Sequence, residues 1–358
     1  MMPENKIPSA NFDSETDYPG FNDESKARAI NQAQFQLKEI VAAKPWRLIF
    51  FFRNLRIIFR NRNLGFFKII SQSVETFKDA FNTATPVLRL HPDTRSERDR
   101  QLALFGKGVQ QNGRIALILH LFYPDLWDET RGYLQSIPEP FDLFISIPAE
   151  SNQIRQELSN DYPDSYIYSC PNHGRDIAPF LEILNAIQGC NYEFICKIHT
   201  KKSLHLKDGD QWRNWLFAEL LGDQKRVLEI LHSFESDDSL GLITPEGYLY
   251  SAIDINSFIN QRWIQKLSEM LAVDLHDFRF DYPAGSMFWC RARTIQKLAA
   301  AGIRTENFEP ERCQLNHTLA HGIERIFGVL VMEQGYRLAD TSGFTPINPG
   351  VSHGYSFY

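Results

Sequence analysis

An apolar strand ends in a cluster of cations at Tyr192-Glu193-Phe194-Ile195-Cys196-Lys197-Ile198-His199-Thr200-Lys201-Lys202-Ser203. The cluster holds three lysines, one histidine and two hydroxyl groups. Like charges repel and lysine resists burial, so this ending is costly to fold, whereas a solvated surface patch would not usually end a buried strand. A bound anion would offset the cost. The stretch therefore predicts a phosphate-bearing ligand at the carboxyl edge of a sheet, where α/β proteins usually place their sites.

Apolar strands and amphipathic helices alternate on both sides of this stretch. We expect strands at residues 114–120, 141–147, 166–170 and 194–198, with helices at 126–134, 154–158 and 177–187 between them. Short strands are expected further on, at 240–244 and 287–290. Such alternation implies right-handed βαβ units. The predicted fold class is therefore α/β, a doubly wound and mostly parallel sheet flanked by helices, with an N-terminal helical extension.

Changes in composition divide the chain into five predicted parts. They are a disordered polar leader (1–35), a basic amphipathic helical segment (36–83), a connector (84–113), the main domain (114–345) and a tail (346–358). The leader is dominated by Pro, Asn, Asp, Glu and Ser, a composition that does not support a packed core.

The basic segment has no acidic residue between Val41 and Val74. Apolar residues share one helical face and arginines form a neighbouring stripe: Leu48, Phe52, Leu55 and Phe59, and Arg53, Arg56 and Arg60. A basic amphipathic helix rich in Phe can lie on an anionic membrane surface, which predicts peripheral membrane contact through residues 44–70. The alternative is a helix that packs on the main domain and shows its arginines to solvent.

Composition narrows the class of protein. With 358 residues, 43% of them hydrophobic, the chain is long enough for one large core or two ordinary ones, and its formal net charge of -6 argues against a general nucleic-acid binder. Five cysteines without a C-x-x-C spacing support neither a disulfide framework nor a zinc site. No signal peptide is evident, and no run approaches the ~18 apolar residues of a spanning helix. We expect a cytoplasmic protein, or one peripheral on the inner face of the plasma membrane.

Four polar clusters follow or adjoin predicted strand ends, and a doubly wound sheet would bring them to one edge. They are His120 with Tyr123 and Asp125, the loop 171–177, the cluster 197–203, and residues 283–287 with Arg291 just downstream. In the loop, Gly174-Arg175-Asp176 opens a helix, where free N–H groups and the helix dipole favour an anion and Arg175 can add a bidentate contact. The alternative is local: a turn, a cap and a surface ion pair.

The acid/base candidates are Asp176, His321 and Glu324, because a carboxylate of suitable pKa can take a proton from a sugar hydroxyl.

Two apparent metal motifs are weak evidence for a metal site. Asp208-Gly209-Asp210 lies in a polar loop and is better explained as a turn. His317 and His321 have helical spacing but no defined third ligand beyond Glu324, so no metal site is predicted. Neither a P-loop nor a G-x-S-x-G pattern is present.

Residues 114–340 resemble the rhamnan synthesis protein F family of bacterial polysaccharide-assembly glycosyltransferases. The shared motifs occur in the family's order: Leu119-His120 with Tyr123-Pro124-Asp125; 171–177; 197–203; Trp212-Arg213; 283–289; and Ala320-His321-Gly322-Ile323-Glu324-Arg325. Two positions depart from the pattern, His173 in place of an arginine and Asn316-His317 in place of an acidic-glycine pair.

The resemblance implies a GT-A-like fold and transfer of a sugar, typically L-rhamnose from a dTDP donor, to a cell-surface or lipid-linked glycan. We assign donor and diphosphate binding to His120, Asn172, Gly174, Arg175, Lys197, His199, Lys201 and Lys202. We assign the acceptor or pocket to Trp212, Arg213, Gly285, Ser286, Trp289 and Arg325. Lys197, His199, Lys201 and Arg175 are expected to replace a metal, so no cofactor is required. Two alternatives remain open, a non-catalytic module that binds nucleotide sugar or glycan, and a polysaccharide phosphotransferase.

Overall fold

The computed structural model describes residues 97–202, 209–252, 260–275, 279–311 and 316–344, all of which belong to one compact unit, Asn54–Ser352. The predicted leader, the basic segment, the tail and the first part of the connector lie outside the described residues. The rest of the predicted connector contains a helix, α4 (Glu97–Lys107). The five predicted domain boundaries stay a prediction.

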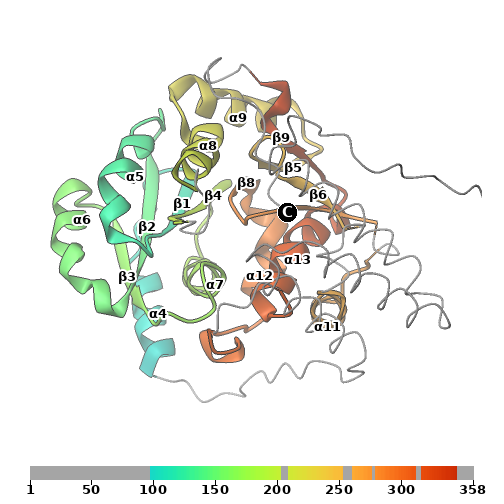
Figure 1. The fold of residues 1–358 in the computed structure, drawn as a ribbon, viewed down its shortest axis with the longest axis horizontal. Helices are drawn as coiled ribbons and strands as arrows, with labels where there is room; N and C mark the ends of the chain where they lie inside the picture. Colours follow the sequence, from blue (N-terminus) through green and yellow to red (C-terminus); the bar gives the residue numbers. More distant parts are fainter. Residues whose placement is uncertain (1–96, 203–208, 253–259, 276–278, 312–315, 345–358) are drawn as a thin grey trace, which may run out of the picture. The chain divides into compact units, whose positions relative to one another are not determined.

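The core of the described chain is a seven-stranded sheet with the order β3-β2-β1-β4-β8-β5-β9 (Figure 1). Its strands are β1 (Ile115–His120), β2 (Phe141–Pro148), β3 (Tyr166–Cys170), β4 (Phe194–His199), β5 (Leu240–Thr244), β8 (Phe288–Arg291) and β9 (Arg337–Asp340). All pairs are parallel except those of β8, which runs antiparallel to both β4 and β5. A separate antiparallel ribbon joins β6 (Leu249–Ser251) to β7 (Asp281–Pro283). The predicted α/β class with a mostly parallel sheet is confirmed.

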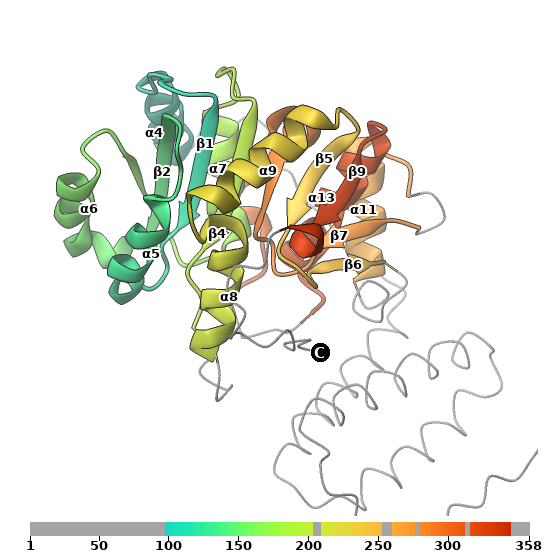
Figure 2. The same ribbon diagram turned by 90° about the horizontal axis from the view of Figure 1, so that it is seen from above.

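Helices cover both faces of this sheet. Figures 1 and 2 show α5 (Trp127–Leu134), α8 (Gly209–Leu221) and α9 (Gln224–Ser236) on one face, and α4, α7 (Ile177–Ala186), α12 (Gln296–Ala299) and α13 (Leu319–Glu333) on the other. Helix α6 (Arg155–Asp161) packs beside β3, and α11 (Gln261–Leu271) packs on α13. Short 3-10 turns complete the connections at Pro124–Leu126, Ala149–Ile154, Ala292–Ile295, Thr305–Asn307 and Thr341–Gly343. No described helix is long and apolar enough to cross a lipid bilayer.

Burial on both faces explains why the central strands read as unbroken apolar runs. Every residue of β1 and β4 is buried, whereas the edge strand β3 is only partly so. Helix α13 reaches the core through Gly328, where a Cβ atom would lie 1.7 Å from the carbonyl oxygen of Asp281. Only glycine permits this approach between α13 and β7.

The strand register fixes which side chains share the carboxyl edge. His120 at the end of β1 pairs with Ser146 of β2 and with His199 of β4. Because β8 is antiparallel, it begins rather than ends at this edge, with Phe288 opposite Lys197. The residues just before β8 therefore join the ends of β1 and β4.

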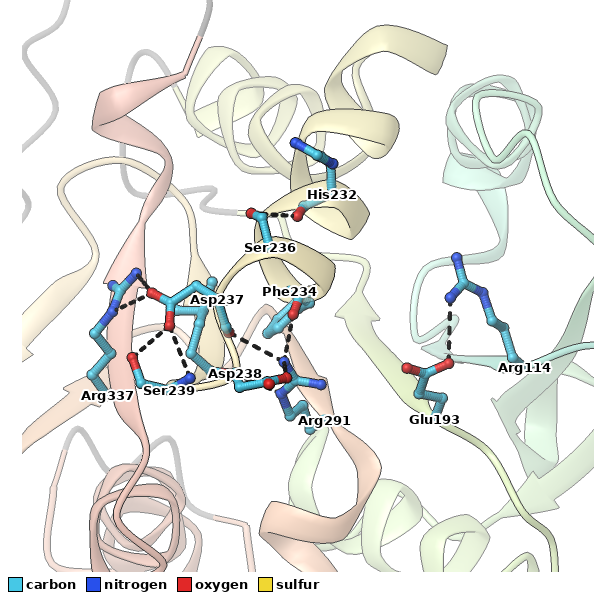
Figure 3. Close-up of polar contacts among 11 residues, drawn as sticks. Arg114, Glu193, His232, Phe234, Ser236, Asp237, Asp238, Ser239, Arg291 and Arg337 are labelled. Atoms are coloured by element: carbon cyan, nitrogen blue, oxygen red, sulfur yellow. Dashed lines mark hydrogen bonds and ion pairs between the residues drawn. The ribbon is translucent and has the colours of Figure 1, made fainter.

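The opposite, amino edge carries a second polar cluster (Figure 3). Arg291 at the end of β8 donates to the carbonyl groups of Leu240 and Phe234, at 2.8 and 2.5 Å. Arg291 was expected beside the carboxyl-edge loops because it follows residues 283–287 closely in sequence. That expectation was wrong, since the antiparallel strand carries Arg291 to the far side of the sheet.

Candidate functional site

Four segments meet at the carboxyl edge of the sheet. They are residues 200–202 after β4, Gly174-Arg175-Asp176 before α7, Gly285-Ser286 before β8, and the first turns of α13. The backbone N–H of Thr200 donates to the carbonyl of His120 at 3.0 Å, so the segment after β4 continues along the end of β1. The structure thus brings together the loops that the sequence predicted to converge.

A buried ion pair joins two of these segments. The ammonium of Lys197 lies 2.5 Å from Oδ2 of Asp176 and donates to the carbonyl of Ser286 at 2.8 Å. The Lys197 side chain is only 2% exposed. Burial alone would raise the pKa of Asp176, but His199 and Lys197 outweigh it and hold that pKa well below its ordinary value. Lys197 therefore ties the start of α7 to the turn before β8.

Two neutral histidines flank this ion pair. Burial lowers the pKa of His120 to about 4, and that of His199 to about 3, against opposition from Asp176 in both cases. Nδ1 of His120 lies 2.9 Å from the hydroxyl of Ser146. Nδ1 of His199 is buried without a hydrogen-bond partner among the described residues, 3.5 Å from Oδ2 of Asp176. A buried nitrogen without a hydrogen-bond partner costs free energy.

Lys201 differs from the other cations at this edge. Its ammonium lies 3.7 Å from the centre of the Trp212 ring and forms no ion pair or hydrogen bond with any described residue. Burial lowers the pKa of Lys201 to about 8, with Glu324 and Asp176 opposing the shift and Arg175 adding to it. Those three groups therefore lie close enough to Lys201 to act on its charge.

Arg175 and His321 meet across the site. Nη1 of Arg175 lies 3.0 Å from Nε2 of His321, and Nε of Arg175 lies 3.6 Å from a carboxylate oxygen of Glu311. Arg175 and the preceding Gly174 both have left-handed backbones, with φ of 58° and 73°. A Cβ atom on Gly174 would lie 2.5 Å from that of Ala178, so glycine is required there. A left-handed arginine is strained, and such strain clusters at functional sites.

Glu324 is held by two donors. Its Oε1 accepts from the backbone N–H of Gly285 at 2.7 Å, and its Oε2 pairs with Arg325. Arg325 is buried and lies 4.8 Å from the centre of the Tyr282 ring. Gly285 and Ser286 have φ of 81° and 55°, so this turn is also left-handed. Glu324 therefore connects α13 to the turn that receives Lys197.

The other residues assigned from sequence are placed at the margin of the site or away from it. Asn172 is exposed, and Lys202 pairs with Asp125. Arg213 is buried and makes a bidentate contact of 2.8 Å with Glu129. Trp289 has no exposed surface, and its indole donates to the carbonyl of Leu220 at 3.1 Å, so it packs in the core of the sheet.

The two suspected metal motifs contribute no cluster in the described structure. Asp208 lies outside the described residues, and Asp210 accepts from Nη1 of Arg213 at 2.7 Å. Within the described ranges, no group of three or more His, Cys, Asp or Glu side chains is placed to hold a metal ion. His173, which stands in place of the arginine of the family pattern, has a structural role. Its Nε2 lies 2.9 Å from the carbonyl of Phe308 and 3.0 Å from that of Glu309.

Comparison with known proteins places the chain in a family. The family model described as rhamnan synthesis protein F matches residues 98–336, which include every segment of the site. The chain belongs to this family. Most of the motifs that suggested the family from sequence have residues that meet at the carboxyl edge.

Individual relatives extend the comparison. Two proteins named "Uncharacterized protein WxcX", from Xanthomonas campestris pv. campestris strains B100 and ATCC 33913, are each 32% identical over 225 residues, which is 62% of this chain and 32% of theirs. The match thus spans about a third of the length of these relatives. The crystal structure of S. aureus TarS 1-349 aligns with 64% of this chain and 58% of its own, at 9% identity and a TM-score of 0.34, too low to bear on function.

Several residues of the site were missed in the sequence. Thr318, Ser146 and Glu311 each contact a predicted site residue, respectively His321, His120 and Arg175. Thr318 had a local signal, since a threonine before an apolar helical run is a preferred N-cap. Glu311 and Ser146 had none, because their contacts depend on the packing of distant segments.

Proposed function

We propose that this chain is a polysaccharide glycosyltransferase that uses a nucleotide-sugar donor. L-rhamnose carried on dTDP is the expected donor, and a cell-surface or lipid-linked glycan is the expected acceptor. The family description supports the polysaccharide, and a GT-A-like arrangement of the sheet would place the donor at its carboxyl edge. Because the match covers about a third of the curated relatives, the activity of this chain needs its own test.

The observation that carries the proposal is the Lys201 ammonium. It is half-buried, has no carboxylate partner among the described residues, and its pKa is lowered to about 8. A cation in that state is stabilised by a bound anion, and the diphosphate of a nucleotide sugar gains negative charge as its bond to the sugar breaks. Lys201 is therefore proposed as the principal diphosphate contact, with Arg175 as the second.

The structure refines the roles proposed for the other residues. Lys197 is tied to Asp176 and Ser286, so it acts on the diphosphate only by positioning these segments. Asp176 has a strongly lowered pKa, which makes it a weak base at neutral pH. Glu324 is then the candidate base for the acceptor hydroxyl. It would take the hydroxyl proton while the acceptor oxygen bonds the anomeric carbon and the nucleoside diphosphate departs.

The test is to incubate the purified full-length chain with a panel of nucleotide sugars and to measure release of the nucleoside diphosphate. A transferase releases the diphosphate of one donor when a glycan acceptor is present, and Glu324→Gln abolishes that release. Binding without turnover would instead indicate a non-catalytic module. Release of a nucleoside monophosphate, with the sugar phosphate retained on the glycan, would indicate a phosphotransferase.

Two accompanying proposals concern the metal and the membrane. If protein cations replace a metal, sugar transfer persists in excess EDTA. Complete loss of transfer that is restored by Mn²⁺ or Mg²⁺ would refute this.

We also propose that residues 44–70 bind anionic membranes reversibly. Flotation with anionic liposomes that is unaffected by charge reversal at Arg53, Arg56 and Arg60 would contradict that.

A further inference from the structure

His321 is held at both of its ring nitrogens. Nε2 lies 3.0 Å from Nη1 of Arg175, and Nδ1 lies 2.6 Å from the hydroxyl oxygen of Thr318. A guanidinium group has donors only, so Nε2 must accept the hydrogen bond from Arg175. The ring is therefore neutral, with its single proton on Nδ1 and donated to Thr318.

The contact with His321 helps to orient Arg175. The backbone of Arg175 is left-handed and its long side chain has many rotamers, and each contact, such as the ion pair at 3.6 Å to Glu311, reduces their number. The hydrogen bond to His321 restrains one terminal nitrogen of the guanidinium plane. Because Thr318 restrains the opposite side of the imidazole, the orientation of Arg175 is set from α13.

The surroundings keep His321 uncharged. Burial lowers its pKa well below the ordinary value, and Arg175, Arg325 and His317 act in the same direction. Asp176 is the opposing group, and it is already paired with Lys197. Glu324, one turn further along α13, is paired with Arg325.

We propose that His321 is a positioning residue whose neutral ring orients the Arg175 guanidinium toward the diphosphate of the donor. This inference rests on the proposed function, and it replaces the acid/base role expected for His321 from the sequence. Both ring nitrogens are occupied by protein groups, so neither is available to exchange a proton with an acceptor sugar. Protonation of Nε2 would turn the acceptor into a donor and place two cations side by side, which releases Arg175.

The test measures binding of inorganic pyrophosphate to the full chain by calorimetry. His321→Leu removes the acceptor, and it is expected to weaken binding about tenfold, the usual effect of losing a hydrogen bond to a charged group. His321→Gln supplies a non-titrating amide oxygen and should bind nearly as well as the unaltered chain. His232→Gln, on the exposed face of α9, is the matched control and should change nothing.

The pH profile separates positioning from a merely structural role. As the pH falls well below the ordinary histidine pKa of 6.5, the affinity of the unaltered chain should fall more than that of His321→Gln, because the buried His321 then takes up a proton that glutamine cannot. Comparison at equal pH cancels the titration of pyrophosphate itself. Nitrogen-15 NMR of the imidazole should show the proton on Nδ1 and an unprotonated Nε2, a readout that needs no variant to fold.

Three results would overturn the inference. One is equal pyrophosphate affinity of His321→Leu and the unaltered chain, another is an identical acid-side loss in His321→Gln, and the third is an NMR spectrum with the proton on Nε2. If the unaltered chain binds pyrophosphate and His321→Leu binds it with equal affinity, this inference alone fails. If the unaltered chain binds none and turns over no nucleotide sugar, the proposed function fails with it.

Discussion

Both edges of the sheet carry arginine or lysine side chains, but the contacts of these side chains differ. At the amino edge, Arg114 contacts Glu139, Glu193 and Glu235 at 2.7, 3.3 and 2.6 Å. Arg337 at the same edge contacts Asp237 at 2.5 Å (Figure 3). At the carboxyl edge, Lys201 has an aromatic ring as its neighbour and no described carboxylate within ion-pair distance.

The difference appears as opposite directions of pKa change. The hydrogen bonds that Arg114 donates to Glu139 raise the pKa of Arg114 against the effect of burial, whereas burial lowers the pKa of Lys201 to about 8. The amino edge is therefore complete without a ligand. At the carboxyl edge Lys201 has no such partner among the described residues, so the pairing of the cations is what distinguishes the proposed anion site.

The largest effect is expected from breaking the buried pair of the carboxyl edge. Lys197→Met leaves the Asp176 carboxylate buried without its cation, which should lower the free energy of unfolding by about 3–5 kcal/mol. Chemical denaturation measures the change. The double variant Lys197→Met with Asp176→Asn should recover part of the loss. A loss near the ~1 kcal/mol of a surface pair would show that Asp176 is solvated.

The second largest effect is expected from acid, which should lower the free energy of unfolding. A histidine whose folded pKa is depressed contributes stability that is present above its unfolded pKa and is lost as pH falls. The pKa of His120 falls from 6.5 to about 4, so this residue should contribute roughly 3 kcal/mol to a decline in stability between those values, and the lowered pKa values of His199 and His321 add to the decline. Urea denaturation at a series of pH values checks this. A His232→Gln chain should show the same decline, and a flat profile would contradict the buried, neutral state of His120.

Removal of the unpaired cation should affect binding more than folding. Lys201→Ala is expected to weaken pyrophosphate binding by about tenfold or more. In the unaltered chain, affinity should fall as pH rises through about 8, because the ammonium of Lys201 then loses its proton. The neighbouring Lys202→Ala, which removes a partner of Asp125, should have a smaller effect. Equal losses from the two variants would remove the distinction between paired and unpaired lysines.

The smallest effect is expected at the amino edge. Arg114 is one-third exposed, so its ion pairs are screened by solvent, and Arg114→Ala should cost less than about 1 kcal/mol of unfolding free energy. Pyrophosphate affinity should not change. Calorimetry of this variant beside Lys201→Ala tests the comparison directly, and weakened binding in Arg114→Ala would contradict it.

Most of the sheet could be predicted because its signals are local. The strands at 166–170 and 240–244 occur with those bounds, and the first, second and fourth strands differ by a residue at one end. Continuous burial imposes continuous apolar sequence, so these strands are visible without knowledge of their partners. The antiparallel insertion of β8 between β4 and β5 was not visible, because strand order depends on contacts between distant segments.

The location of the site could be predicted from the sequence, but the contacts between its side chains could not. The glycines and cations of residues 171–177, 197–203 and 283–287 do meet at one edge. Which of these cations form ion pairs could not be predicted from the sequence, because nothing in the sequence distinguishes Lys197 from Lys201 in this respect. Every position of β4 is buried, that of Lys197 included, whereas Lys201 follows the strand and contacts Trp212. Only three-dimensional packing decides which cation remains available.

The reversed direction of β8 has a consequence for how this site can change. The chain leaves the sheet after Thr244 of β5 and returns at Phe288 of β8, on the same side of the sheet. Residues 245–287 are thus a detour that starts and finishes beside the cations. The detour, with its own β6–β7 ribbon, lies outside the ladder of the seven-stranded sheet, so its sequence can change one wall of the site while the strands that hold Lys197 keep their register.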